Sequence, residues 1–367
     1  MSLATSISEI DVYSSSWAID AAWSEVGRLD LPALNQVFLK SPASLYQYPL
    51  WNEPYRKLGL TPRYLVWGTS RRPIAAATIL TAGFGPVKIG LVFRGPVQLI
   101  PEADLPHSLF AGLIAWARLQ GYVFLRFTHS NLQILNGLAA AGHALNEDAF
   151  PYMLDYPVLT QDYMAEQQEC DEHTLASFDR EVRRKLRRAE EAGYEFRAED
   201  SPEALAQAWP LYEECSRRKQ FRLERPLSFY VDLMRTARAF DMAQLYTVRL
   251  HGKTVGSTLV FRDRTTAHCQ IAAFDTEHRQ SAVFLHWHAM RHMYRLGARR
   301  YNMGPGPGAL ARFKGQFCQR PVQYPGPITV VLRKNWFRLW RKIFIPAAKQ
   351  LHPIFRKLAM KRAALSR

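Results

Sequence analysis

Phe313 and Lys314 are the residues in this chain best placed to do chemistry, because they follow a loop that has almost no side chains. Gly or Pro occupies every position of residues 304–308. Such a loop is stiff and lets another molecule approach the backbone closely. The Lys314 ammonium could stabilise a developing oxyanion or hold a phosphate, and the Phe313 ring could stack on a base. The pattern predicts a site for a large anionic substrate, with Gly304 and Gly306 in its wall. The alternative is a surface lysine beside a core phenylalanine.

A second candidate is the basic segment at residues 183–193. It carries Arg183, Arg187 and Arg188 on a predicted helix that ends at a glycine. Most charge runs of this kind are solvated helix faces balanced by neighbouring acids. The functional alternative is a helix that contacts phosphates, since the arginine fork binds phosphate in a bidentate manner.

Histidines offer weaker candidates. His278 lies in a predicted loop between a strand and a helix, where backbone N–H groups could bind an anion, and we count it as a candidate for site chemistry. His288 and His292 are four positions apart on the next predicted helix. No glutamate stands between them in a zinc-protease pattern and no third ligand is evident, so we expect packing or surface roles and no metal site.

These residues must be positioned by two similar α/β units. The chain has 367 residues, enough for two domains. Strand, turn, strand, strand, helix and strand follow one another in both halves, so we predict an α/β (α+β) fold of two tandem domains, each with a mixed sheet. In the first half we also predict one helix over residues 45–59. The expected domains are residues 1–159 and 160–332, and the last strand, residues 327–332, would return to the first.

A basic segment, residues 333–367, completes the chain. The formal net charge is +16, and no acid follows Val331. Tryptophans and phenylalanines alternate with these bases, which is typical of an amphipathic helix at a membrane interface. A helix docked on its own domain with a basic outer face fits equally well. The four cysteines show no paired spacing and no signal peptide is evident, so we expect a cytoplasmic protein, with peripheral contact to the inner face of the membrane if the tail binds lipid.

Four motifs together resemble the FemAB family of aminoacyl transferases, within the wider GNAT-like acyltransferases. The segment from Tyr46 to Trp51 is similar to the family's N-terminal helix, and Arg94-Gly95-Pro96-Val97 to its RGPV strand end. Residues 183–193 are similar to its basic helix. Residues 297–317, with Tyr301-Asn302 and Phe313-Lys314, are similar to its C-terminal signature.

The resemblance implies two GNAT-like domains and transfer of an amino acid from aminoacyl-tRNA to an amine of a peptidoglycan precursor, as in cell wall biogenesis. It implies that Lys314 and Phe313 lie near the reacting ester, and we add Tyr301 as a catalytic candidate and Arg94 and Trp51 as substrate contacts. The chain departs from the family in two ways. It has no long coiled-coil arm, and Cys318 follows Phe317 where the family often has Gly.

Three functions stay open. The first is tRNA-dependent N-acyl transfer to a nucleotide- or lipid-linked envelope precursor, with no cofactor. The second is transfer from acyl-CoA to an amino sugar or a lipid-linked saccharide. Residues 276–295 contain no glycine, which argues against a standard cradle for the CoA pyrophosphate. The third is a non-catalytic protein that binds membrane or RNA.

Overall fold

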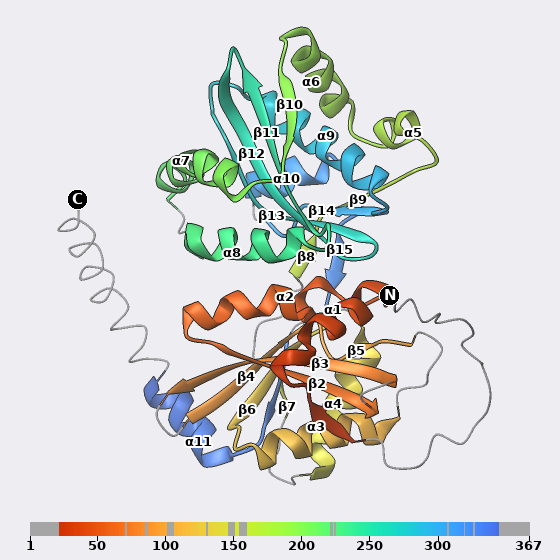
Figure 1. The fold of residues 1–367 in the computed structure, drawn as a ribbon, viewed down its shortest axis with the longest axis vertical. Helices are drawn as coiled ribbons and strands as arrows, with labels where there is room; N and C mark the ends of the chain where they lie inside the picture. Colours follow the sequence, from red (N-terminus) through yellow and green to blue (C-terminus); the bar gives the residue numbers. More distant parts are fainter. Residues whose placement is uncertain are drawn as a thin grey trace, which may run out of the picture.

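The computed structural model describes residues 22–344, except 70–71, 85–86, 101–105, 130, 146–150, 154–159, 221–222, 224, 307, 319 and 326. Within these residues the strands form an eight-stranded sheet, a six-stranded sheet and a two-stranded ribbon. Figure 1 shows the two large sheets in separate halves of the molecule, with the ribbon of β8 and β15 between them. The predicted fold class, a mixed α/β chain with two similar domains, is confirmed.

The first sheet has the strand order β1-β2-β3-β4-β6-β16-β7, and β5 pairs with β3. Leu65 and Trp67 pack with α3 and α4 on one face, whereas Tyr64 and Val66 pack with α1 and α2 on the other. This alternation is the period of two expected of a sheet covered on both sides. The elements are β1 (Trp23–Glu25), η1 (Arg28–Asp30), α1 (Leu31–Lys40), α2 (Pro49–Asn52), β2 (Thr61–Thr69), β3 (Arg72–Phe84), β4 (Val87–Phe93), β5 (Val97–Gln98), α3 (His107–Leu119), β6 (Phe124–Thr128), α4 (Leu132–Leu145), β7 (Pro151–Met153) and β16 (Ile328–Val331).

The second sheet has the strand order β10-β11-β12-β13-β14-β9. Here α9 connects the parallel strands β13 and β14, just as α3 connects the parallel strands β4 and β6 in the first half. Helices α6 and α9 cover one face, and α7 and α8 cover the other. The elements are β9 (Met164–Glu166), α5 (Asp171–Ala176), α6 (Arg180–Glu191), β10 (Glu195–Glu199), α7 (Pro202–Arg218), α8 (Leu227–Arg238), β11 (Ala243–Leu250), β12 (Lys253–Arg262), β13 (Thr266–Phe274), α9 (Ser281–Arg295), β14 (Arg300–Asn302) and α10 (Gly308–Gly315).

The two halves share one apolar core. Buried residues of α1 and α2 cluster with buried residues of α7, α8 and β11–β13. Trp51 on α2, for example, lies edge-on to Phe261 on β12, with ring centroids 5.3 Å apart. The prediction of a single helix over residues 45–59 was wrong. The segment is broken into η2 (Leu45–Gln47), α2 and η3 (Glu53–Leu58), because Pro49 and Pro54 each lack the N–H that a continuing helix needs.

The chain crosses between the halves twice, and the two crossings lie side by side. Strand β8 (Thr160–Asp162) leads into β9 of the second sheet, and β15 (Val322–Tyr324) leads back to β16 of the first. They pair antiparallel, with Asp162 opposite Val322 and Thr160 opposite Tyr324. Strand β16 then lies between β6 and β7. The ribbon therefore brings side chains of both crossings to the junction of the domains.

Helix α11 (Lys334–Leu339) and the π-helical turn η4 (Trp340–Phe344) follow β16. The Phe337 ring packs against Phe124 of β6, with centroids 5.3 Å apart, so the beginning of the basic segment docks on the first domain. The rest of that segment, residues 345–367, lies outside the described residues. Within the described part of the chain, no helix is both long enough and apolar enough to cross a bilayer.

Candidate active site

Lys314 is bound to the glycine- and proline-rich loop that precedes its own helix. Its Nζ donates to the backbone oxygens of Met303 at 2.5 Å, Gly304 at 3.2 Å and Pro305 at 2.7 Å. Helix α10 follows this loop and turns the lysine back over it. Burial lowers the pKa of Lys314 below its usual 10.5, and Asp162 and Cys269 act in the opposite direction. The ammonium therefore carries the positive charge of the site and holds the loop in one conformation.

Two glycines of the loop are required by its shape. Gly304 has φ +70°, a backbone conformation that residues with a Cβ rarely adopt. At Gly306 a Cβ would lie 2.7 Å from Cγ of Leu310, so the Leu310 side chain would have to move. Phe313 is partly buried and packs edge-on against Phe317 with centroids 5.3 Å apart. The predicted pairing of a rigid loop with Phe313 and Lys314 thus exists in the structure.

A chain of hydrogen bonds leads from this loop to the first domain. The Gly304 N–H donates to Asn302 Oδ1 at 2.7 Å, and Asn302 Nδ2 donates to Asp162 Oδ2 at 2.9 Å. Arg94 Nη2 donates to the same carboxylate oxygen at 3.2 Å. Arg94 follows β4, Asp162 ends β8 and Asn302 ends β14. The second domain's loop and the first domain's Arg94 are therefore connected through one carboxylate.

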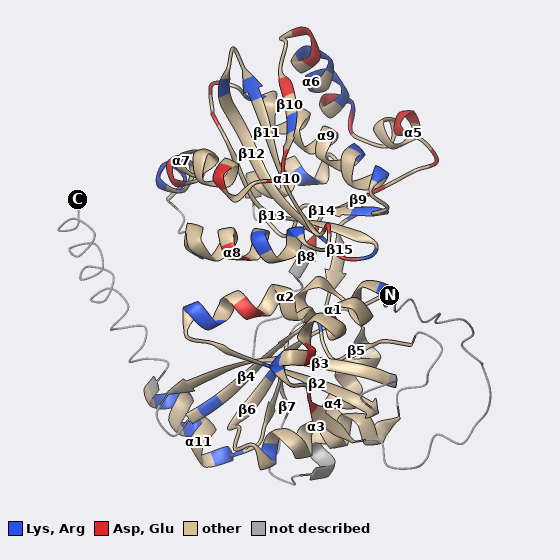
Figure 2. Cartoon of the chain, viewed as in Figure 1, with Lys and Arg blue, Asp and Glu red and all other residues tan. Residues whose placement is uncertain are grey.

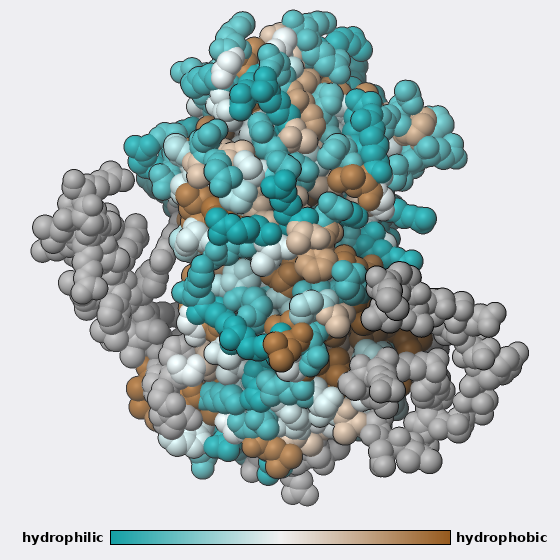
Figure 3. Space-filling model, in the orientation of Figure 1, coloured by the Kyte–Doolittle hydropathy of each residue, from teal (hydrophilic) through white to brown (hydrophobic). Residues whose placement is uncertain are grey.

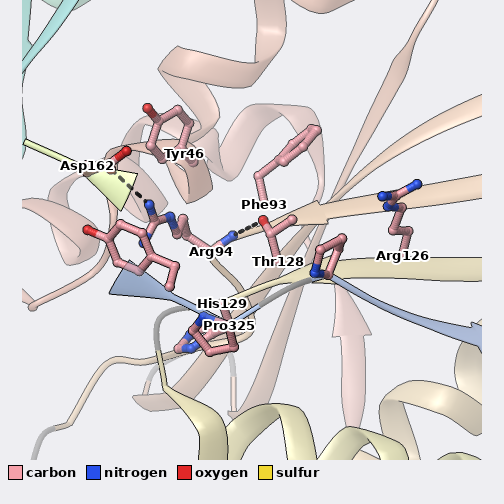
Figure 4. A pocket seen from close by; sticks show the side chains of 10 residues that line it. Tyr46, Phe93, Arg94, Arg126, Thr128, His129, Asp162 and Pro325 are labelled. Carbon is pink, nitrogen blue, oxygen red and sulfur yellow. Dashed lines mark hydrogen bonds and ion pairs between the residues drawn. The ribbon is translucent and has the colours of Figure 1, made fainter. Parts of the chain in front are cut away.

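A cavity of about 460 Å³ opens at this junction. It lies where the parallel strands β4 and β6 end, which is where open α/β sheets usually bind ligands. Figure 4 shows Arg94 reaching toward Asp162, with Tyr46 on one side and His129 and Pro325 on the other. The wall is formed by Tyr46, Phe93, Arg94, Arg126, Thr128, His129, Asp162, Tyr324, Pro325 and Pro327.

The cavity combines cations with aromatic rings. The Arg94 guanidinium stacks over the Tyr324 ring, 3.6 Å from its centroid. The backbone of Arg94 has φ +57°, and its N–H donates to the Thr128 carbonyl at 2.6 Å. His129 Nδ1 accepts from the Asn131 N–H at 2.9 Å. Burial, and then the charge of Arg94, lower the pKa of His129 to about 4, so it is neutral at pH 7. The arginines therefore supply the positive charge of this wall, beside the Asp162 carboxylate, and His129 supplies none.

The sequence of the second half agrees with a known domain. Residues 176–315 match the family model described as an acetyltransferase (GNAT) domain, a stretch that runs from the end of α5 to the end of α10. This part of the chain is a GNAT acyltransferase domain. It contains the parallel pair β13 and β14, the loop and Lys314. No curated protein matches the chain.

Solved structures share the fold across both halves of this acyltransferase. The crystal structure of FemX aligns with a TM-score of 0.72 at 15% identity, covering 86% of this chain and 99% of FemX. The C-terminal domain of a protein assigned as a lysylphosphatidylglycerol synthetase from Agrobacterium fabrum gives 0.53 at 17% identity, with 82% and 91% covered. A tandem GNAT protein from the clavulanic acid biosynthesis pathway gives 0.51 at 13% identity, with 85% and 99% covered. At these identities the likeness is one of fold.

Two sequence-predicted residues lie in the core of the acyltransferase. Trp51 is 1% exposed and packs on Phe261 and Tyr46. The prediction that Trp51 contacts substrate is therefore corrected, because its side chain packs between the two domains. Tyr301 is fully buried, and its hydroxyl lies 3.3 Å from Nδ1 of His286. Burial raises the pKa of Tyr301 well above 10, so it remains a protonated partner of His286.

The three predicted arginines of the basic helix α6 differ in their surroundings. Arg183 Nη1 donates to the carbonyls of Ala176 at 2.6 Å and Phe178 at 3.1 Å, and so fixes the turn before the helix. Phe178 in turn packs on Phe317, next to α10. Arg187 and Arg188 are exposed. Of the three predicted arginines, the structure ties Arg183 to the neighbourhood of Lys314 and leaves the other two on the surface.

The contacts of His278 do not include Lys314 or its loop. It follows β13 in the loop before α9, and its Nδ1 is 3.5 Å from the Tyr194 hydroxyl. In the same loop the Glu277 N–H donates to Asp275 Oδ1 at 3.1 Å. No interaction within the described residues connects His278 with the loop of Lys314 or with the cavity, so the structure does not bring this candidate to the others.

The sequence alone did not suggest Asp162, Asn302, Tyr324, Arg126 or His129 as site residues. Asn302 stands beside Tyr301 in the recognised signature, and its amide bonds Asp162 and Gly304. Asp162 and Tyr324 end strands, His129 follows β6 and Arg126 lies within β6, and none of the four belongs to a local motif. One signal could have found Asp162 and Tyr324: they belong to the two segments that cross between the domains, and crossings of that kind lie at a domain junction.

Proposed function

We propose that this acyltransferase moves an aminoacyl group from aminoacyl-tRNA to a primary amine of an anionic cell-envelope precursor. The observation that carries the proposal is the direct connection from the cavity to the Lys314 loop through Arg94, Asp162 and Asn302. A cationic, aromatic cavity for the acceptor thus adjoins a rigid loop that bears the charge needed by an acyl transfer.

The reaction is aminolysis of an ester. The acceptor amine attacks the ester carbonyl, a C–N bond forms, and the bond from carbonyl carbon to ribose oxygen breaks. The amine loses one proton and the leaving ribose oxygen gains one, so no oxidant, reductant or metal is required. Negative charge develops on the carbonyl oxygen, and a nearby cation in a partly buried site stabilises it. Lys314 is the cation on the loop, and Phe313, which is partly exposed beside it, is available to stack on the terminal base of the tRNA.

The loop between β13 and α9 supports a donor other than CoA. GNAT domains that use CoA bind its pyrophosphate with free backbone N–H groups at this position. Here the Asp275 carboxylate accepts from the Glu277 N–H, and Lys253 pairs with the same carboxylate at 3.2 Å. Hydrogen bonding to the Glu277 N–H is the main reason that the pKa of Asp275 is lowered. A pyrophosphate would therefore have to displace a charged carboxylate of the same sign.

The acceptor side is supported by the charge of the cavity. Arg94 and Arg126 line it, and Asp162 is engaged by Arg94 and Asn302. Phosphate or carboxylate groups of a nucleotide- or lipid-linked precursor would be bound by these guanidinium groups. The protein from Agrobacterium fabrum is named for the synthesis of lysylphosphatidylglycerol, the lysyl ester of the anionic lipid phosphatidylglycerol. Phosphatidylglycerol is therefore the alternative acceptor to test.

A transfer assay tests the proposal. The full chain is incubated with a radiolabelled amino acid on a pool of charged tRNA, or with radiolabelled acetyl-CoA, and with a nucleotide-linked peptidoglycan precursor or phosphatidylglycerol vesicles as acceptor. We expect label from tRNA to enter the precursor. Lys314→Ala should reduce the rate by about 100-fold, because it removes both the positive charge beside the ester and the hydrogen bonds that hold the loop.

Arg312→Ala is the matched control, because Arg312 is exposed on the same helix, and it should leave the rate unchanged. Transfer only from acetyl-CoA would reject the tRNA donor, and labelled phospholipid alone would reject the amine acceptor. If Lys314→Ala transferred label as fast as the wild type, Lys314 would have no part in catalysis.

A further inference from the structure

The segment formed by α11 and η4 has two apolar faces, and only one of them is covered. Phe337 is 5% exposed and packs on Phe124, and the Trp340 ring lies 6.1 Å from the same ring. These residues join a small cluster with Val87 and Ile89 of β4 and Val331 of β16, on interior strands of the first sheet. The helix is therefore held on the first domain by its Phe337 face, and its other sides are directed outward.

The uncovered face carries large apolar side chains at helical spacing. Trp336, Leu339 and Ile343 are 36%, 36% and 54% exposed. They are three and then four positions apart, so they form one stripe along the segment. Exposed apolar residues are common singly, but a stripe of three on one element marks an interaction site. Figure 3 shows hydrophobic surface at the left edge of the first domain, where Figure 1 places α11.

Basic residues flank this stripe, and the surrounding chain lacks acids. In the sequence, Arg338 and Lys342 lie between its members, and Lys334 and Arg341 are on the same segment. Figure 2 shows basic residues in blue along α11. Among the described residues, neither Arg338 nor Lys342 has an acidic partner, and no Asp or Glu follows Glu277 anywhere in the sequence. The face is thus apolar at its centre and positive at its margin.

We infer that this face, defined by Trp336, Leu339 and Ile343 with Arg338 and Lys342, docks the protein on an anionic lipid bilayer. An amphipathic helix of this composition lies in the plane of the interface, with its apolar residues among the acyl chains and its bases at the headgroups. Nucleic acid would satisfy the bases but not the stripe, because two of its three members are aliphatic and cannot stack on a base. The two apolar faces have separate partners: the Phe337 face binds the first domain and the Trp336 face binds the bilayer.

Vesicle co-sedimentation of the full chain tests the inference. Wild-type protein should sediment with vesicles of equal parts phosphatidylglycerol and phosphatidylcholine, and not with pure phosphatidylcholine. The variant W336S/L339S/I343S should bind the anionic vesicles at least tenfold more weakly. R338Q/K342Q should weaken binding by about 25-fold, at about fivefold for each cation near an anionic surface, and should reduce its salt dependence.

The matched control is L29S/L119S, which removes two apolar side chains that are 95% and 85% exposed elsewhere on the first domain. It should bind as the wild type does. Thermal unfolding monitors the fold of each variant. If the triple variant does not fold, vesicle binding is measured with I343S alone, at the most exposed position of the stripe. Filter binding of tRNA should be unaffected by the serine substitutions. The inference is overturned if the serine variants retain full vesicle binding, or if they lose tRNA binding instead.

Discussion

Arg94 and Asp162 form an ion pair that joins the two halves of the chain at the wall of the cavity. Arg94 Nη2 lies 3.2 Å from Asp162 Oδ2, and the two side chains are only 22% and 9% exposed. The same carboxylate oxygen accepts from Asn302, which also orients Gly304 and so the loop held by Lys314. Since the pair has partners on both sides, its loss should disturb the cavity and the loop together.

Asp162→Asn should therefore weaken both stability and activity. Removing one partner of a buried pair costs about 3–5 kcal/mol, and the partial exposure of Arg94 reduces this to about 2 kcal/mol here. Since the acceptor cavity is affected first, we expect KM for the acceptor to rise by more than kcat falls. Urea unfolding and steady-state transfer kinetics measure the two effects.

Glu166→Gln is the control for this substitution. Glu166 pairs with Arg300 at 3.3 Å in the same sheet as Asn302, but both side chains are more than half exposed. A pair of that kind contributes less than about 1 kcal/mol, so the control should unfold and react almost as the wild type does. Equal effects of the two substitutions would show that the Asp162 carboxylate is not a structural connection between the domains.

The rate of transfer should decline on the alkaline side with a midpoint below pH 10.5. Burial lowers the pKa of Lys314, so the protonated amine, which is needed to donate to three carbonyls, is present only below that lowered pKa. As the pH rises through this pKa, Lys314 loses its charge and one hydrogen-bond donor. The hydrogen bonds that hold the loop are then weakened. The pH dependence of kcat/KM measures the midpoint.

Lys314→Arg separates this cause from other alkaline effects. A guanidinium stays charged throughout the accessible range, so any activity that the variant retains should lack the alkaline decline. An unchanged decline in the arginine variant would assign it to another group, such as the acceptor amine.

The sequence predicted those parts of the site that are local in the chain. Glycines and prolines at residues 304–308 indicated the rigid loop, and Lys314 is near enough in sequence to be assigned to it. The ion pair of Arg94 and Asp162 could not be predicted, because its members are 68 positions apart and meet only where β8 passes between the domains. Hydrophobic period and turn residues likewise predicted most strands and helices, since these depend on near neighbours.

Trp51 shows the opposite failure, in which a residue of a recognised motif was given the wrong kind of role. An aromatic residue in a segment that resembles a family motif is equally compatible with substrate stacking and with core packing. The choice is made by Phe261, which lies 210 positions later and meets Trp51 only because the two domains share a core. Tertiary contacts of this range are not contained in any local pattern.

Trp51→Ala should consequently act on stability rather than on substrate affinity. Truncating a fully buried large aromatic costs about 3–5 kcal/mol, through lost burial and the cavity that remains. Urea unfolding should show this loss, while KM for both substrates stays within about twofold at a temperature where the variant is folded. Trp336→Ala, at a half-exposed tryptophan, should lose less than about 1 kcal/mol. A rise in KM for Trp51→Ala without loss of stability would restore the substrate-contact role.

Acid should destabilise the protein through buried neutral histidines, and His286 should contribute most clearly. Burial, and then the charge of Lys314, lower the pKa of His286 from 6.5 to about 3. Below pH 6.5 the imidazole is protonated in the unfolded chain but stays neutral in the folded chain. Stability therefore falls as the pH falls, and the loss continues to about pH 3. Between pH 6.5 and 5 this amounts to roughly 2 kcal/mol for the one residue.

His286→Gln tests this assignment, because glutamine can still bond the Tyr301 hydroxyl but does not titrate. Urea unfolding at pH 7, 6 and 5 should show a shallower loss of stability for this variant than for the wild type. His107→Gln removes an exposed histidine at the start of α3 and should leave the slope unchanged. Should both variants follow the wild-type curve, the acid sensitivity would belong to other groups, with His129, whose pKa is also lowered, the next to replace.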